Sequence, residues 1–103
     1  MNGIEKIDIR INSLTSNKDL TIIPSTLKVY VNGKEKSITA EKIGELLDIV
    51  RKWDFEYIDD NITDAETFRV KVYNTQGVDE YFGSGKYPDT YEAFKDWVTS
   101  IYG

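Results

Sequence analysis

Carboxylates and aromatic rings are interleaved through the second half of this 103-residue sequence, and this pattern is the clearest source of chemistry in the chain. Residues 53–60 read Trp-Asp-Phe-Glu-Tyr-Ile-Asp-Asp, and similar mixtures occupy residues 79–82 and 87–92. A carboxylate forms charge-assisted hydrogen bonds with lysine or arginine, and an exposed ring adds buried area and cation–π contacts with arginine. The pattern is therefore typical of a surface that binds a basic surface of another protein.

The acids are concentrated in that same half, although the formal charge of the whole chain is only -5. Residues 1–52 hold seven acids and nine bases, whereas residues 53–103 hold eleven acids and four bases. No lysine or arginine interrupts the stretch from Asp54 to Glu66. Phosphate backbones and anionic lipids repel this charge, so direct binding to nucleic acid or to a membrane is disfavoured and a basic protein surface is attracted. The alternative interpretation is that the acids only keep a small domain soluble.

The expected binding surface combines these acids with tyrosines that the core does not need. Aromatic residues are far more frequent after position 52 than before it, and tyrosine is favoured in protein interfaces. We expect the core to take Trp53, Phe55, Phe82, Phe94 and Trp97. The expected partner-binding residues, whose tyrosines should be exposed, are Asp54, Glu56, Tyr57, Asp59, Asp60, Asp64, Glu66, Asp79, Tyr81, Tyr87, Asp89 and Tyr91.

Most catalytic chemistry is excluded by residue types that the sequence lacks. There is no cysteine and no histidine, which excludes disulfides, thiolate metal sites, serine–histidine triads and imidazole acid–base catalysis. The run Gly83-Ser84-Gly85-Lys86 is not a Walker phosphate loop, because such a loop needs glycine where Glu80 stands and serine or threonine where Tyr87 stands. We therefore expect no enzyme activity, no cofactor and no resident metal.

Residues 59–64 have the oxygen-rich composition of a calcium-binding loop but not its pattern. Counted from Asp59, the sixth position is Asp64, where an EF-hand needs glycine. The twelfth position is Val70, where an EF-hand needs a bidentate glutamate. An EF-hand is excluded, and only an adventitious cation site near these residues stays open.

Alternation of apolar and polar residues predicts the strands that would position these groups. The clearest case is residues 4–12, in which three isoleucines alternate with polar side chains. Asn32-Gly33 predicts a type I′ turn between strands at residues 27–31 and 34–38. The other extended segments expected are residues 20–23, a strand that begins near Phe55 and Tyr57, and a second hairpin of residues 67–74 and 78–82.

Two amphipathic helices are predicted, one after each hairpin. Residues 40–52 carry apolar side chains at helical spacing behind an N-cap at Thr39, and residues 90–101 follow the capping-box pair Asp89 and Glu92. The economical architecture is α+β: an antiparallel sheet of about five strands, built as one strand and two hairpin–helix units, with both helices on one face. The opposite, solvated face would carry Lys28, Tyr30, Arg69, Lys71 and Tyr73.

The length favours one compact domain over residues 1–103, and its apolar runs are far shorter than a bilayer requires. The amino terminus lacks the basic-then-apolar order of a signal peptide, so a cytoplasmic location is expected. No feature of the sequence predicts the oligomeric state.

Small size, acidic charge and missing catalytic groups favour a non-enzymatic module that binds a basic, nucleic-acid-binding partner. The expected mechanism is inhibition by nucleic-acid mimicry, the class of mechanism associated with phage anti-CRISPR and anti-restriction proteins. An immunity protein that neutralises a toxic nuclease would rely on the same physics and stays open as an alternative. A small-ligand-binding or homo-oligomeric accessory domain is the remaining alternative.

Overall fold

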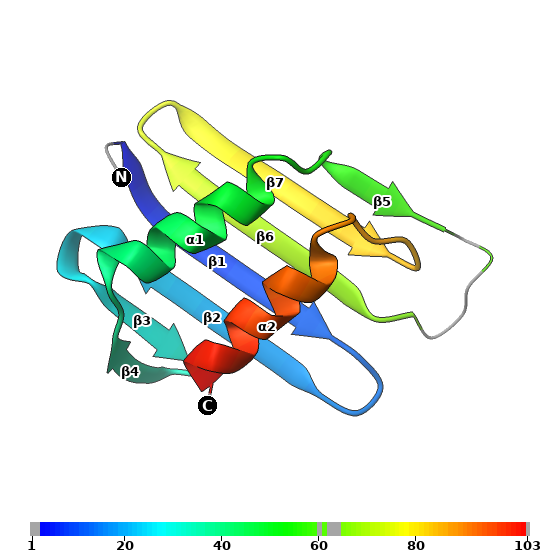
Figure 1. Cartoon of the computed structure of the whole chain (residues 1–103), viewed down its shortest axis with the longest axis horizontal. Coiled ribbons are helices and arrows are strands. Elements are labelled where there is room, and N and C mark those ends of the chain that lie inside the picture. The colour runs from blue at the N-terminus through cyan, green and yellow to red at the C-terminus, as the bar shows by residue number, and fades with distance from the viewer. Residues whose placement is uncertain (1–2, 60, 62–64, 103) are drawn as a thin grey trace.

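One mixed sheet and two helices make up the computed structural model, which describes residues 3–59, 61 and 65–102. The strands are β1 (Ile4–Asn12), β2 (Asn17–Ile23), β3 (Lys28–Val31), β4 (Lys34–Ser37), β5 (Glu56–Ile58), β6 (Thr67–Asn74) and β7 (Gly77–Ser84). The helices are α1 (Ala40–Val50) and α2 (Tyr91–Tyr102), and a 3-10 turn spans Pro24–Thr26. Within the described residues the sheet order is β4-β3-β2-β1-β6-β7-β5, and β5 runs parallel to β7 (Figure 1).

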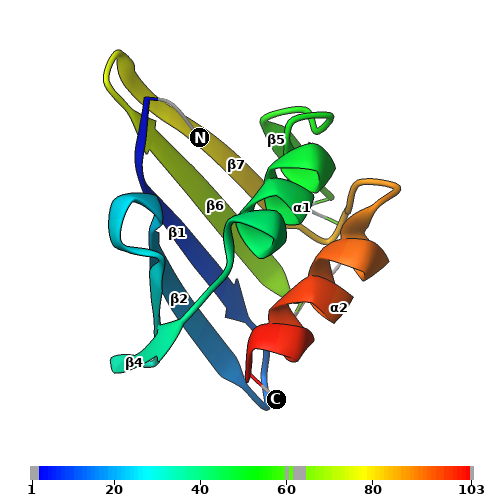
Figure 2. The same ribbon diagram turned by 60° about the vertical axis from the view of Figure 1, so that its left-hand side comes forward.

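Both helices cover one face of the sheet and leave the opposite face open, as the turned view in Figure 2 shows. The core lies between these two layers, where inward side chains of the strands meet the apolar sides of α1 and α2. The prediction that both helices share one face is confirmed, and the fold is α+β. The largest fully buried side chains are Phe68, Phe94, Ile7, Ile9, Leu20, Ile22, Ile43, Leu46, Val29, Val50, Val70 and Val98.

Local sequence signals place the first strand and the first hairpin correctly. β1 occupies residues 4–12, and its three alternating isoleucines face the helices. At the β3–β4 turn, Asn32 and Gly33 have φ angles of 49° and 87°. These left-handed values are what a type I′ turn requires, so the Asn-Gly prediction is confirmed.

The expected sheet of about five antiparallel strands is wrong in strand number and in one pairing direction. The expected extended segment of residues 20–23 is longer in the structure: residues 17–19 also belong to β2, which pairs with both β1 and β3. The turn before β2 is closed by Ser13 N, which donates to Ser16 O at 2.8 Å. Residues 56–58 form β5, the strand expected near Phe55 and Tyr57, and it pairs with β7 in parallel rather than antiparallel. Strand order in a sheet is a long-range property, which period-two alternation alone does not encode.

The helices begin close to their predicted caps. Thr39 Oγ1 accepts a hydrogen bond from Lys42 N at 3.1 Å, so the predicted N-cap of α1 is confirmed. α2 begins at Tyr91, one residue later than predicted. Thr90 Oγ1 accepts a hydrogen bond from Trp53 Nε1 at 2.7 Å, which ties the start of α2 to the segment that follows α1.

The aromatic core differs from the expected set at two positions. Trp53, Phe94 and Trp97 are buried, as expected. Phe55 is 58% exposed and Phe82 is partly exposed, which corrects their assignment to the core. Both residues lie where β7 meets the edge strand β5, and Phe82 alternates with buried neighbours so that it points to the open face.

Candidate functional site

The edge strand β5 combines exposed apolar side chains with carboxylates. Phe55 is 58% exposed and Ile58 is 47% exposed. Asp54 and Glu56 are exposed beside them, and Asp59 is partly exposed. We call these five residues, Asp54, Phe55, Glu56, Ile58 and Asp59, the acidic edge. Part of the acid-and-ring pattern of residues 53–60 is therefore displayed on the surface, with Phe55 in the exposed position that was expected for Tyr57.

The backbone of β5 is paired on one side within the described residues. Phe82 N donates to Phe55 O, and Asp59 N donates to Ser84 O, both at 2.9 Å, so Phe55 and Asp59 direct these groups at β7. Because residues alternate in a parallel ladder, the N–H and C=O of Glu56 and Ile58 point away from the sheet. Such groups on an edge strand are available to a strand from another chain.

Tyr57 joins the acidic edge to the core. Its hydroxyl oxygen accepts a hydrogen bond from Asp54 N at 2.8 Å, and its ring centroid lies 6.4 Å from that of Phe68 in the core. Tyr57 is half-buried rather than fully exposed, so it fixes the edge more than it faces outward. Phe55 is also held in place, because its ring stacks on Tyr81 with centroids 5.3 Å apart.

Glu66 belongs to a separate, half-buried network at the start of α2. Its Oε2 accepts a hydrogen bond from Tyr91 Oη at 2.5 Å and lies 3.3 Å from Lys95 Nζ, while its backbone oxygen accepts from Tyr87 Oη at 2.7 Å. Tyr91 is only 5% exposed, so its expected exposure is wrong: the core takes its ring, and Glu66 satisfies its hydroxyl. Burial and the Glu66 carboxylate together raise the pKa of Tyr91 far above its usual value.

The two adjacent acids of β7 point to different faces of the sheet, and only Asp79 belongs to the predicted partner-binding set. Glu80 Oε2 lies 2.9 Å from Arg69 Nε, an ion pair on the open face, whereas Asp79 lines a cleft on the helix side. Tyr81 is 7% exposed, so its expected exposure is also wrong, because its ring packs edge-on against Trp53 at 6.2 Å. Among the other predicted residues, Asp89 is exposed before α2, Tyr87 is half-buried, and Asp60 and Asp64 lie outside the described residues.

The open sheet face carries basic and acidic side chains together: Asp8 lies opposite Lys71, and Glu80 pairs with Arg69. Arg10 on β1 lies directly opposite Arg69 on β6, and Lys71 follows on the same face. Asp19 Oδ1, 3.5 Å from Arg10 Nε, compensates part of this charge. The predicted outer-face set of Lys28, Tyr30, Arg69, Lys71 and Tyr73 is confirmed by the alternation and register of β3 and β6. The acidic edge therefore borders a face whose arginines are already paired with acids.

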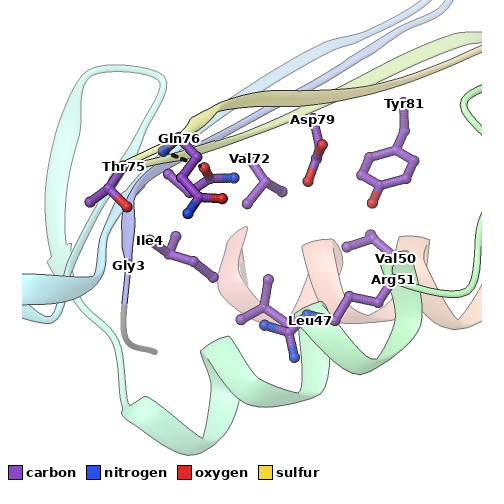
Figure 3. A pocket seen from close by; sticks show the side chains of 11 residues that line it. Gly3, Ile4, Leu47, Val50, Arg51, Val72, Thr75, Gln76, Asp79 and Tyr81 are labelled. Atoms are coloured by element: carbon purple, nitrogen blue, oxygen red, sulfur yellow. Dashed lines mark hydrogen bonds between the residues drawn. The ribbon is translucent and has the colours of Figure 1, made fainter.

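A cleft of about 360 Å³ opens on the helix side, between α1 and the hairpin that joins β6 to β7 (Figure 3). Arg51 extends into it from the end of α1, and Asp79 and Tyr81 extend toward α1 from β7. Sequence reasoning missed this cleft, because Arg51 reads as a solvated charge at a helix end and Asp79 as part of an acidic surface. The apolar part of its lining is Ile4, Leu47, Val50 and Val72.

The remaining sequence motifs have plain structural positions. Gly83 and Ser84, from the run that is not a Walker phosphate loop, are the last residues of β7. Within the described residues, no group of three acidic, histidine or cysteine side chains is placed to hold a metal ion. The calcium-like segment falls largely on residues 60 and 62–64, which lie outside the described residues. Neither α1 nor α2, the helices of the described part, is long and apolar enough to cross a membrane.

The chain matches no protein-family model, and no curated protein or solved structure was found to be similar to it. Charge, exposure and geometry therefore have to carry any functional assignment.

Proposed function

We propose that this chain is a non-enzymatic protein-binding module that inhibits a basic, nucleic-acid-binding enzyme by docking through the acidic edge. The observation that carries the proposal is the exposure of Phe55 and Ile58 among carboxylates, on a strand whose outer edge pairs with no other described strand. Apolar side chains at the centre of an interface supply affinity. The surrounding carboxylates select a partner rich in lysine and arginine and accelerate its encounter.

The charge of the acidic edge favours a basic partner over a second copy of the chain. Two such edges brought together would place Asp54 and Glu56 of one copy near the same acids of the other. Like charges opposed across paired strands are destabilising. An extended basic segment would instead pair with the free N–H and C=O groups of β5 while its lysines or arginines meet the carboxylates.

An enzyme that binds nucleic acid supplies the required chemistry, because it uses lysine and arginine side chains to hold phosphates. Carboxylates that occupy those side chains would compete with the nucleic acid for the same surface. Inhibition by occupation of this surface needs no catalytic group in the module. The apolar contacts and the acids must lie together, because physiological salt screens the attraction between exposed charges and charge alone would bind weakly.

The test compares three baits in affinity capture from a bacterial lysate at low salt: the wild type, Asp54→Lys/Glu56→Lys, and Glu45→Lys/Asp48→Lys. The third bait is the matched control, since Glu45 and Asp48 are exposed on α1 and give the same charge change. We expect the wild type and the control to retain a nucleic-acid-binding enzyme that duplex DNA and added salt displace. The edge variant should bind the purified enzyme at least about tenfold more weakly.

Equal affinity of the edge variant for that enzyme, or retention that duplex DNA does not reduce, would overturn the proposal. Both double variants should keep the wild-type unfolding midpoint, because exposed ion pairs each contribute about 0–1 kcal/mol. Light scattering of the isolated chain provides a separate check. A mass of two or more copies that the edge variant abolishes would assign the acidic edge to self-association and overturn the proposal as well.

A further inference from the structure

Two opposite charges face the cleft on the helix side without forming an ion pair. Arg51 approaches from the end of α1 and Asp79 from β7, on opposite walls (Figure 3). Neither side chain forms a salt bridge with any residue in the described ranges. Other charged residues do form such pairs, including Arg69 with Glu80 on the open face and Lys95 with Glu66 beside α2. The cleft therefore presents one cationic and one anionic group to whatever enters it.

Tyr81 adds a hydroxyl that is not hydrogen-bonded to the protein. Its ring is held between Trp53 and Phe55, and the side chain is only 7% exposed. No hydrogen bond joins its hydroxyl to another described residue, and no buried side-chain polar atom in the described part lacks a partner. The hydroxyl must therefore open into the cleft, as Figure 3 shows. The hydroxyl of a nearly buried tyrosine normally forms a hydrogen bond within the protein. The Tyr81 hydroxyl forms none with a described residue, so it is available to a ligand.

The Tyr81 hydroxyl shares the cleft with both charged side chains and is affected by each of them. Burial raises the pKa of the Tyr81 hydroxyl, Asp79 raises it further, and Arg51 lowers it. Both charges therefore act on the same hydroxyl from the two sides of the cleft. Leu47 and Val50 of α1 form a nearly buried apolar floor, and Ile4 is the apolar lining residue with more exposed surface. Asn74, Thr75 and Gln76 of the β6–β7 hairpin add polar groups at the other end of the cleft.

We propose that this cleft binds a small zwitterion of the free amino-acid type with an apolar side chain. The carboxylate of the ligand would pair with Arg51 and accept a hydrogen bond from the Tyr81 hydroxyl, while its ammonium group pairs with Asp79. Its side chain would lie against Ile4, the most exposed apolar residue of the lining, beside Leu47. The volume of about 360 Å³ is at the small end of the range for ligand sites, which suits a molecule of this size.

A ligand with only one charge would satisfy the cleft less well. An anion alone would leave Asp79 facing a like charge, and a cation alone would do the same to Arg51. A neutral molecule would displace water from both charged side chains without forming an ion pair with either, which is unfavourable. The site is distinct from the acidic edge, so this inference does not rest on the proposed function.

The experiment is a titration of the full chain with L-leucine, in which binding is measured by calorimetry and by NMR of the backbone amides. Leucinamide lacks the carboxylate, and N-acetylleucine lacks the ammonium group, so each removes one half of the zwitterion. We expect L-leucine to bind with shifts that centre on the amides of α1 and β7 near the cleft. Each derivative should bind at least about tenfold more weakly, the usual effect of losing one charged contact.

Adjacent residues supply matched controls for the three polar groups. Arg51→Gln should weaken leucine binding about tenfold, whereas Lys52→Gln removes the same charge outside the cleft and should not. Asp79→Asn should weaken binding similarly, and Glu80→Gln on the opposite face should not. Tyr81→Phe keeps the buried ring and should weaken binding several-fold without unfolding the chain.

The inference is overturned if neither L-leucine nor L-phenylalanine shifts the cleft amides at concentrations up to about 20 mM. It is also overturned if either derivative binds as tightly as L-leucine, or if the control variants lose as much affinity as their partners. Because Asp54→Lys/Glu56→Lys leaves the cleft intact, that variant should bind L-leucine normally. This comparison separates failure of the inference from failure of the proposed function.

Discussion

Replacement of Gly83 by alanine should reveal how tightly the sheet and the aromatic core are joined. An alanine Cβ at this position would lie 2.0 Å from Phe68 Cε1 and 2.6 Å from Phe68 Cζ. Carbon atoms in contact prefer separations of about 3.5–4.0 Å, so the ring or the strand must move by roughly 1.5 Å. Phe68 is only 1% exposed, with ring centroids 5.3 Å from Trp53 and 5.0 Å from Tyr91. The ring has no free space to enter.

Overpacking of a filled core costs about 1–3 kcal/mol, and the confinement of Phe68 places Gly83→Ala at the upper end of that range. The lower entropy of the unfolded chain with alanine returns about 0.4–1 kcal/mol. We therefore expect a net loss of about 2 kcal/mol in the free energy of unfolding. For a domain of this size, that loss lowers Tm by about 10–15 °C.

The assay is urea denaturation followed by tryptophan fluorescence, with Gly44→Ala as the matched control. A Cβ at Gly44 meets nothing within 4 Å, and Gly44 lies inside α1, so that variant should be stabilised by about 0.5–1 kcal/mol. Adding Phe68→Leu to Gly83→Ala should cost less than the two separate changes combined, because the smaller side chain relieves the clash. Equal midpoints for the two glycine variants, or strictly additive costs in the double variant, would refute this reasoning.

Two further predictions concern hydrogen bonds at the start of α2. The folded Tyr91 hydroxyl keeps its proton above the usual pKa of 10.0, so its stabilising effect is complete below that pH and declines as the pH rises. Between about pH 9 and pH 12, the Tm of thermal unfolding should therefore fall more steeply for the wild type than for Tyr91→Phe. Equal slopes of Tm against pH would contradict the burial of this hydroxyl. Thr90→Val removes the acceptor of the Trp53 Nε1 hydrogen bond and should lower the free energy of unfolding by about 1–2 kcal/mol in urea titrations. The control Thr99→Val, at an exposed position of α2, should change the free energy of unfolding by less than about 0.5 kcal/mol. Similar losses in both variants would count against a structural role for this hydrogen bond.

Features governed by neighbouring residues could be predicted from the sequence. Asn32-Gly33 specifies its turn because both residues tolerate positive φ, and Thr39 caps α1 because its hydroxyl reaches the backbone of Lys42. The apolar period of β1 also identifies the side that faces the helices. Each of these depends on contacts within a few residues of the chain.

Features governed by distant contacts could not be predicted in the same way. Tyr81 and Tyr91 resemble surface tyrosines because acids flank them, yet Trp53 covers one ring and Phe68 the other. Phe55 resembles a core residue, but the position of β5 at the edge leaves it exposed. Whether each aromatic side chain is buried or exposed depends on the strand order. The sequence around residues 53–60 has no clear periodicity and does not determine that order.

The same is true of the candidate sites. The composition of residues 53–60 indicates an acidic surface with apolar groups, but it does not separate Tyr57, which supports the edge, from Ile58, which is exposed. The cleft lies between the end of α1 and the β6–β7 hairpin, so Arg51 and Asp79 face the same space only once the sheet has formed. No local pattern links these two residues.

The pairing of β1 with β6 in the middle of the sheet has a consequence for synthesis of the chain. β1 to β4 and α1 leave the ribosome first, while the strand that completes the other side of β1 is still being translated. Until then, β1 is a temporary edge with Ile7 and Ile9 only partly covered, and the nascent chain must avoid pairing with its neighbours. We expect joining of the two halves through this central pair to limit the folding rate, since it closes the longest loop in the sheet.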